Sequence, residues 1–308
     1  MKEKRFINVM EVCPRDGWQN LPRVIPTEEK KYFIEKMLDA GIKKMQICSF
    51  VSPRAIPQMH DAKEVSAYFI KNYPDCEFNA LIPNLRGAKD AVESGFNKVS
   101  YVVSVSESHN KANIGMTHEQ SKEGLAKIME GFPSLGITLA LATSFGCPFE
   151  GNVPFERVMD FIDYGIKKGI KSFELADTIG VANPVQIKEV FSSVKEKHPD
   201  IILMAHMHDT RNNGIINSWT ASENGADIIH TALGGLGGCP FAPGASGNTS
   251  TEDIVYILER SGFETGIDFK GILAAAKEMR ERIPGTYSGH HINIVSDSYE
   301  EALRAGAK

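Results

Sequence analysis

The sequence predicts an α/β fold built as a single (β/α)8 barrel, the fold called a TIM barrel. Short apolar runs rich in β-branched residues recur between residues 5 and 233, and amphipathic helical segments separate them. Continuous apolar runs are typical of parallel strands buried on both faces. No polar linker and no shift in composition divides these residues, which favours one domain. A doubly wound open sheet is the alternative, although its usual glycine-rich first turn, GxGxxG, is absent.

The predicted elements follow one another in a regular order. Strands are expected at residues 5–12, 43–50, 76–83, 98–105, 137–144, 171–177, 201–208 and 226–233. Helices with one apolar face are expected at residues 26–41, 152–169, 183–198 and 269–283. Asn152 is the expected cap of the second helix, and Asn183 caps the third, with Pro184 at the first helical position. We expect the barrel to occupy residues 1–262 and a C-terminal helix and tail, residues 263–308, to pack on it.

Composition and charge argue against several classes of protein. The formal net charge of −5 gives no reason to expect nucleic acid or an anionic membrane as a partner. No stretch reaches the roughly 18 unbroken apolar residues of a membrane helix, and we expect neither a secretory signal nor a peroxisomal tripeptide at the ends. The cysteines lie far apart without a CxxC pair, which indicates reduced thiols in a cytoplasmic protein. They are Cys13, Cys48, Cys76, Cys147 and Cys239.

Polar side chains gather where the predicted strands end. In a barrel of this kind, active sites lie at the carboxyl ends of the strands and in the loops that follow them. The residues at these ends are Arg15 and Asp16 after the first strand; Gln46, Cys48 and Ser49 at the second; Asn84 at the third; Ser104 and Ser106 at the fourth; Asp177 and Thr178 at the sixth; and His206 and His208 at the seventh. The sequence therefore predicts a site at one rim of the barrel.

The segment MAHMHD predicts a metal site. Strand side chains alternate between faces, so His206 and His208 point to the same side and can chelate one ion. Asp16 is the candidate third ligand, because the first and seventh strands reach the same end of the barrel. Histidines and oxygen ligands favour Mg²⁺ or Mn²⁺, and Zn²⁺ fits the same residues. The alternatives are satisfied core histidines, and a surface ion pair or turn at Arg15 and Asp16.

A glycine-rich segment, GGLGGCPFAPGASGN, follows the eighth strand. So many glycines disfavour a regular element and predict a lid or a loop that approaches a ligand closely. Within it, Cys239 offers a thiol that can move and Asn248 offers an amide oxygen. A flexible linker is the alternative, but cysteine, proline and phenylalanine together are poor linker composition.

At these residues the sequence resembles the 3-hydroxy-3-methylglutaryl-CoA lyase family, within the larger group of metal-dependent lyases, aldolases and Claisen condensases. The matching segments run in family order from about residue 8 to residue 253: PRDGWQN, SFVSPRAIPQM, FGCPFEGNV, DTIGVANP, HMHDT and GGLGGCPFAPGASGN followed by TED. The last segment is close to the family signature and is highly specific, whereas HxH alone is not.

The resemblance implies a divalent-metal-dependent carbon–carbon lyase that cleaves a 3-hydroxyacyl-CoA to acetyl-CoA and a 3-oxo acid, acetoacetate. It also implies a homodimer and a part in leucine degradation and ketone-body formation. The implied metal ligands are Asp16, His206, His208 and Asn248; the implied catalytic residues are Arg15, His206, Asp177 and Cys239; and Ser49 and Thr178 match family residues near the free carboxylate of the substrate. Gln46 and Arg211, which depart from the family pattern, are also expected to bind the substrate. In this scheme Arg15 stabilises charge on the thioester oxygen, and His206 or Asp177 takes the hydroxyl proton.

The sequence departs from the family pattern around the expected substrate. Gln46 stands where the family ends its second strand with a catalytic glutamate, and a glutamine cannot act as an acid or base. The other departures are Leu21, Ala112, Glu174, Arg211 and the tail with His290 and His291. A lyase for a different 3-hydroxyacyl-CoA, selected by Arg211 or Glu174, is therefore one alternative. A slower lyase, a Claisen condensase and an inactive barrel are the others.

Overall fold

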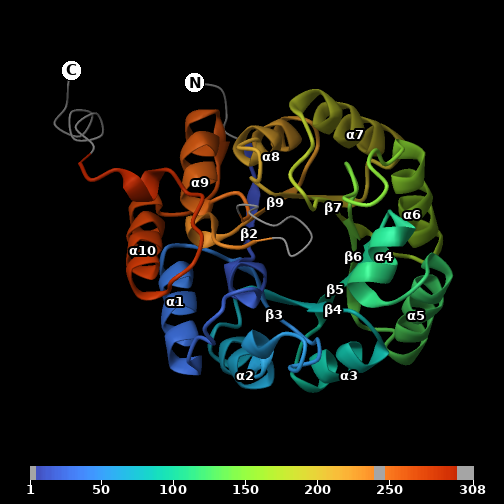
Figure 1. Cartoon of the computed structure of the whole chain (residues 1–308), viewed down its shortest axis with the longest axis horizontal. Helices are drawn as coiled ribbons and strands as arrows, with labels where there is room; N and C mark the ends of the chain where they lie inside the picture. Colours follow the sequence, from blue (N-terminus) through green and yellow to red (C-terminus); the bar gives the residue numbers. More distant parts are fainter. Residues whose placement is uncertain (1–4, 239–246, 297–308) are drawn as a thin grey trace.

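The computed structural model describes residues 5–238 and 247–296. Its centre is a closed barrel of parallel strands in the order β2-β3-β4-β5-β6-β7-β8-β9, and helices surround the barrel (Figure 1). The strands are β2 (Asn8–Glu11), β3 (Lys44–Ser49), β4 (Glu77–Ile82), β5 (Lys98–Ser104), β6 (Gly136–Ala142), β7 (Ser172–Asp177), β8 (Ile202–Met207) and β9 (Ile228–Thr231). The prediction of one (β/α)8 barrel is confirmed, and the open sheet is wrong.

Helices follow the strands and cover the outside of the barrel. They are α1 (Thr27–Asp39), α2 (Ala62–Asn72), α3 (Leu85–Glu93), α4 (Glu107–Ile114), α5 (His118–Gly131), α6 (Phe155–Lys167), α7 (Pro184–Lys197), α8 (Gly214–Glu223), α9 (Thr251–Arg260) and α10 (Phe269–Arg282). The Asn183 side chain accepts a hydrogen bond from the N–H of Gln186, so the predicted cap of α7 is confirmed. The predicted Asn152 cap is wrong, because Pro154 is extended and α6 begins after it.

Apolar packing between helices and strands fixes the barrel wall. Phe173 on β7 is fully buried under α6. A Cβ atom at Gly165 of α6 would lie 2.6 Å from the Phe173 ring, so only glycine lets the helix approach this closely. Such contacts hold the strand ends rigidly, and those ends carry the polar side chains described below.

The C-terminal part packs beside the first strand and the last barrel helix. β1 (Arg5–Phe6) pairs in parallel with β10 (Phe263–Glu264), and α10 contacts α1 and α9. The Asp253 carboxylate accepts hydrogen bonds from the backbone N–H groups of His290 and His291. These bonds tie the segment after α10 to the start of α9, near the mouth of the barrel.

Within residues 5–238 and 247–296, no helix combines the length and the apolar character that crossing a membrane requires.

Candidate active site

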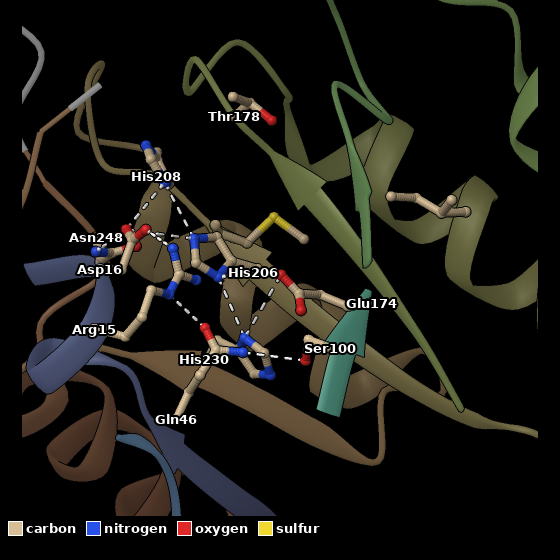
Figure 2. A network of polar contacts seen from close by, with 12 residues as sticks. Arg15, Asp16, Gln46, Ser100, Glu174, Thr178, His206, His208, His230 and Asn248 are labelled. Atoms are coloured by element: carbon tan, nitrogen blue, oxygen red, sulfur yellow. Dashed lines mark hydrogen bonds and ion pairs between the residues drawn. The ribbon is translucent and has the colours of Figure 1, made fainter. Parts of the chain in front are cut away.

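Polar side chains from neighbouring strands meet inside one end of the barrel (Figure 2). The cluster consists of Arg15 and Asp16 after β2, Gln46 on β3, Glu174 on β7, His206 on β8, His208 directly after it, His230 on β9 and Asn248 before α9. All are buried. The predicted rim site therefore exists as one connected group.

A tight turn after β2 places Arg15 and Asp16 in the cluster. Residues Cys13–Gly17 form a buried π-helical turn in which Val12 O accepts hydrogen bonds from the N–H groups of Arg15 and Asp16. A Cβ atom at Gly17 would lie 3.2 Å from the Leu236 carbonyl oxygen, so the turn packs closely on the segment after β9. Single π-helical turns are frequent at functional sites.

Asp16, His206 and His208 form a group with the spacing of metal ligands. Nε2 of His206 lies 3.1 Å from Nε2 of His208, and Oδ2 of Asp16 lies 4.0 Å and 3.8 Å from these two atoms. The Asn248 amide donates to the same Asp16 oxygen at 2.8 Å. Its Oδ1 is buried and has no hydrogen-bond partner among the described residues. A buried oxygen without a partner beside two imidazoles and a carboxylate suits a divalent cation.

Electrostatics keep these groups in the protonation states that a cation needs. Burial opposes ionisation of Asp16, but the charge of Arg15 and the hydrogen bond from Asn248 outweigh it, so the pKa of Asp16 lies below its usual range. Burial lowers the pKa of His206 and of His208, so both rings are neutral and each keeps a lone pair. The residues present therefore fit a divalent metal ion.

Gln46 is a hydrogen-bond partner of Arg15. Arg15 donates from Nη1 to Asp16 and from Nε to Oε1 of Gln46. The Gln46 amide in turn donates to Asn79 Oδ1 at 3.2 Å and to Ser100 Oγ at 3.1 Å. Because its second partner is a neutral amide, Arg15 keeps more of its positive charge available than it would beside two carboxylates.

Glu174, His206 and His230 form a second group of candidate ligands behind the first. Nδ1 of His206 lies 3.2 Å from Nδ1 of His230 and 3.5 Å from Oε1 of Glu174. Burial raises the pKa of Glu174 to about 7 and lowers that of His230 to about 3. Sequence reasoning missed His230, because a single histidine in an apolar strand carries no signal. Its inward position beside His206 comes from the pairing of β8 with β9.

A cavity of about 440 Å³ opens onto the cluster. Its charged and ionisable wall includes Arg15, Asp16, Glu174, His206 and His208, and its other lining includes Val51, Ile56, Leu81, Val102, Ala140, Ala142 and Thr178. The size is ordinary for a small-molecule site that is largely apolar with a few convergent polar groups.

The other predicted site residues have different positions. Both carboxylate oxygens of Asp177 accept backbone N–H groups, from Val181 and Ala182, and Asp177 does not line the cavity. Arg211 donates to the carbonyl oxygens of Ile179 and Gly180. These two residues therefore hold the turn after β7.

Thr178 lines the cavity, whereas Ser49 is not among the described residues that line it. The cavity-lining Thr178 accepts a hydrogen bond from the N–H of Thr143 at 2.7 Å. Ser49 is buried at the end of β3, and its Oγ has no hydrogen-bond partner within the described part of the chain. Cys239 lies outside the described residues.

Comparison with known proteins gives one consistent result. The sequence model of the family described as HMGL-like matches residues 6–279. Hydroxymethylglutaryl-CoA lyase YngG of Bacillus subtilis is 37% identical over 300 residues, which cover 97% of this chain and all of that protein. An (R)-citramalyl-CoA lyase of Chloroflexus aurantiacus is 35% identical and covers 88% of this chain and 89% of its own length.

Solved structures agree with the sequence matches. An HMG-CoA lyase from Acinetobacter baumannii, in complex with coenzyme A and 3-methylmalate, superimposes with a TM-score of 0.87. It is 39% identical and covers 98% of this chain and 95% of its own. An HMG-CoA lyase from B. subtilis gives a TM-score of 0.88 at 36% identity, covering 95% of this chain and 98% of its own. The chain therefore belongs to the HMGL-like family, and it is a carbon–carbon lyase.

Proposed function

We propose that this lyase cleaves 3-hydroxy-3-methylglutaryl-CoA, or a closely similar 3-hydroxyacyl-CoA, to acetyl-CoA and a 3-oxo acid, and that it requires a divalent cation. The observation that carries the proposal is the buried group of Asp16, His206 and His208 beside Arg15, at the wall of a cavity of about 440 Å³. The family and its hydroxymethylglutaryl-CoA lyase members support the substrate class.

Asp16, His206, His208 and Asn248 are the proposed ligands of the cation. When bound, a divalent ion supplies a Lewis acid that lowers the pKa of the substrate hydroxyl and polarises the forming ketone. We propose Mg²⁺ or Mn²⁺, because two of the four ligand atoms are oxygens.

The protein's own groups supply the rest of the reaction. Arg15 is held by Asp16 and Gln46, so its guanidinium is fixed in place for the negative charge that develops on the thioester oxygen. Of the two predicted acceptors of the hydroxyl proton, His206 lines the cavity and Asp177 does not. His206 is therefore the better placed of the two, but its single lone pair cannot both ligate the ion and take the proton. We assign His206 to the ion, and Asp177 holds the turn after β7.

Cleavage of a related substrate is the second candidate function. Gln46 replaces the expected glutamate, and Glu174 adds a carboxylate to the cavity wall. The chain is also 35% identical to a protein described as an (R)-citramalyl-CoA lyase. The changed cavity wall and this similarity favour testing a second acyl-CoA that has a tertiary hydroxyl and a shorter acid chain.

Location, assembly and metabolic role are separate proposals. We propose a cytoplasmic protein, on the basis of its scattered cysteines, and a homodimer that takes part in leucine degradation and ketone-body formation. Size-exclusion chromatography with light scattering tests the dimer, and a mass near 34 kDa would contradict it.

The test of function is metal-supplemented cleavage of 3-hydroxy-3-methylglutaryl-CoA and of citramalyl-CoA, with acetyl-CoA measured as product. We expect turnover with Mg²⁺ or Mn²⁺ that is lost on chelation. Turnover of citramalyl-CoA alone would replace the first substrate by the second. A protein that binds one metal ion per chain and cleaves neither thioester would refute both substrates.

A further inference from the structure

We propose that Glu174 and His230 are positioning residues that set the tautomer of His206 and present its Nε2 lone pair to Asp16 and His208. This inference rests on the metal site of the proposed function. It concerns the side chains of Glu174 and His230, which lie across the His206 ring from His208 (Figure 2).

The two nitrogens of the His206 ring face two different groups. On one edge, Nε2 lies 3.1 Å from Nε2 of His208 and 4.0 Å from Oδ2 of Asp16. On the other edge, Nδ1 lies 3.2 Å from Nδ1 of His230 and 3.5 Å from Oε1 of Glu174. The same Glu174 oxygen lies 3.8 Å from Nδ1 of His230. His206 is therefore the shared member of an outer and an inner group.

The chemistry of a neutral imidazole decides what the inner group does. Such a ring carries one N–H and one lone pair. Nδ1 of His206 and Nδ1 of His230 are close enough for a hydrogen bond, so one of them carries the hydrogen and the other accepts it. The carboxylate form of Glu174 can only accept, and in that form it favours a hydrogen on the Nδ1 atoms near it. With the hydrogen of His206 on Nδ1, the lone pair lies on Nε2, toward the proposed ligands.

A carboxylate or another acceptor behind a metal-ligating histidine is a recurrent arrangement that fixes the ring orientation and raises the basicity of the ligand. Here the arrangement is built on strands rather than loops. Glu174 on β7 and His230 on β9 flank β8, and His206 pairs directly with His230 in the sheet register. All three side chains are buried, and Glu174 and His206 also line the cavity. The inner group is therefore held in place by the sheet.

The inner group could instead bind the ion itself, but its geometry and bonding argue against this. An ion in the inner group would take the Nδ1 lone pair of His206, which would leave no lone pair on Nε2 for the outer group, so only one of the two groups can use His206. The outer group has Asn248 as a fourth candidate, whose buried Oδ1 has no hydrogen-bond partner among the described residues. The outer group therefore offers the more complete set of ligands.

The test measures Mn²⁺ binding by electron paramagnetic resonance in the absence of substrate, on the full chain. We expect Glu174→Leu to weaken Mn²⁺ affinity about 10–100-fold while one ion per chain still binds. Glu174→Gln should recover most of the affinity, because its amide oxygen keeps an acceptor in the place of Oε1, which lies 3.5 Å from Nδ1 of His206. Ser66→Ala is the control: it removes a buried hydroxyl on α2 that donates to the Ala62 carbonyl oxygen of its own helix, and it should leave Mn²⁺ affinity unchanged.

A second readout follows the tautomer itself without metal. In histidine-labelled protein, ¹⁵N resonances assigned with His206→Gln should report the Nδ1–H form of His206 in the parent. In Glu174→Leu and in His230→Leu, the same ring should shift toward the Nε2–H form. If these substitutions only destabilised the fold, they would lower the melting temperature and leave the His206 ¹⁵N resonances in the Nδ1–H form.

Several results would overturn the inference. Parental Mn²⁺ affinity in Glu174→Leu would remove its positioning role. Loss of binding in Glu174→Leu and His230→Leu, with binding retained in His208→Ala, would place the ion in the inner group. A parent protein that binds no Mn²⁺ would overturn this inference together with the metal site. The expected affinities without acyl-CoA cleavage would refute only the proposed substrates.

Discussion

Replacing Gln46 by glutamate introduces the residue that we expect in the 3-hydroxy-3-methylglutaryl-CoA lyase family at the end of the second strand, and it tests whether this barrel tolerates that residue. In the structure, the Gln46 amide donates to Asn79 and Ser100, and its oxygen accepts from Nε of Arg15. An ionised glutamate keeps the contact with Arg15 but cannot donate. It would also place a second acceptor against Asn79 Oδ1.

The expected loss of stability in Gln46→Glu follows from these contacts. Two buried hydrogen bonds at about 1 kcal/mol each are lost, and the charge-assisted bond to Arg15 returns about 1 kcal/mol. Repulsion from Asn79 and the cost of burying the charge add to the loss. We expect Gln46→Glu to lower the free energy of unfolding by about 1–3 kcal/mol at pH 8.

The loss should be smaller at pH 5. Burial raises the folded-state pKa of an introduced carboxyl above its unfolded value. The folded protein then holds a proton that the unfolded chain releases as pH rises, so stability falls with increasing pH. At pH 5 the protonated acid can donate to Asn79 and replace one of the lost bonds.

Thermal unfolding followed by circular dichroism at both pH values measures this effect. A loss of 1–3 kcal/mol corresponds to a fall in melting temperature of about 2–10 °C for a domain of this size. In a Ser100→Ala background the cost of Gln46→Glu should be about 1 kcal/mol smaller, because one of the two bonds is already gone. A melting temperature at or above that of the parent at pH 8, or a larger loss at pH 5, would refute the reasoning.

Three further predictions concern the metal site, the glycine-rich segment and a buried carboxyl. Asp16→Ala and His208→Ala should each lower both Mn²⁺ affinity and turnover by more than about 100-fold, which exceeds the loss expected from removing a residue that only contacts a ligand. One ion per chain at parental affinity in both variants would refute the ligand assignment. Cys239→Ser should leave Mn²⁺ affinity intact and lower the turnover number, and unchanged turnover would remove the thiol from the mechanism. Burial and the charge of Asp253 raise the pKa of Glu252 to about 8, so between the ordinary carboxyl pKa of 4.5 and about 8 the folded state retains a proton that the unfolded state has lost. Parental stability should therefore fall across this range, and Glu252→Gln should flatten the decline in melting temperature; an equally steep decline in the variant would contradict it.

Much of the fold could be predicted from the sequence, because the signals are local. Buried parallel strands require continuous apolar runs, and helices require one apolar face, so both leave periodic patterns in the chain. The same locality made the placement of His206 and His208 on one face predictable, since strand side chains alternate. The prediction of a helix cap at Asn152 was wrong, because α6 begins only after Pro154.

The sequence by itself therefore determined the barrel, the order of its strands and the rim that carries the polar residues. Only the tertiary structure decided which of those residues meet. Closure of β2 onto β9 brings the turn carrying Arg15 and Asp16 to the side of the barrel that carries His206, and strand register sets His230 beside His206. Nearby backbone N–H groups hold the Asp177 carboxylate in its own turn. These outcomes depend on pairing between distant strands and on competition among nearby hydrogen-bond partners, and neither leaves a pattern in a local stretch of sequence.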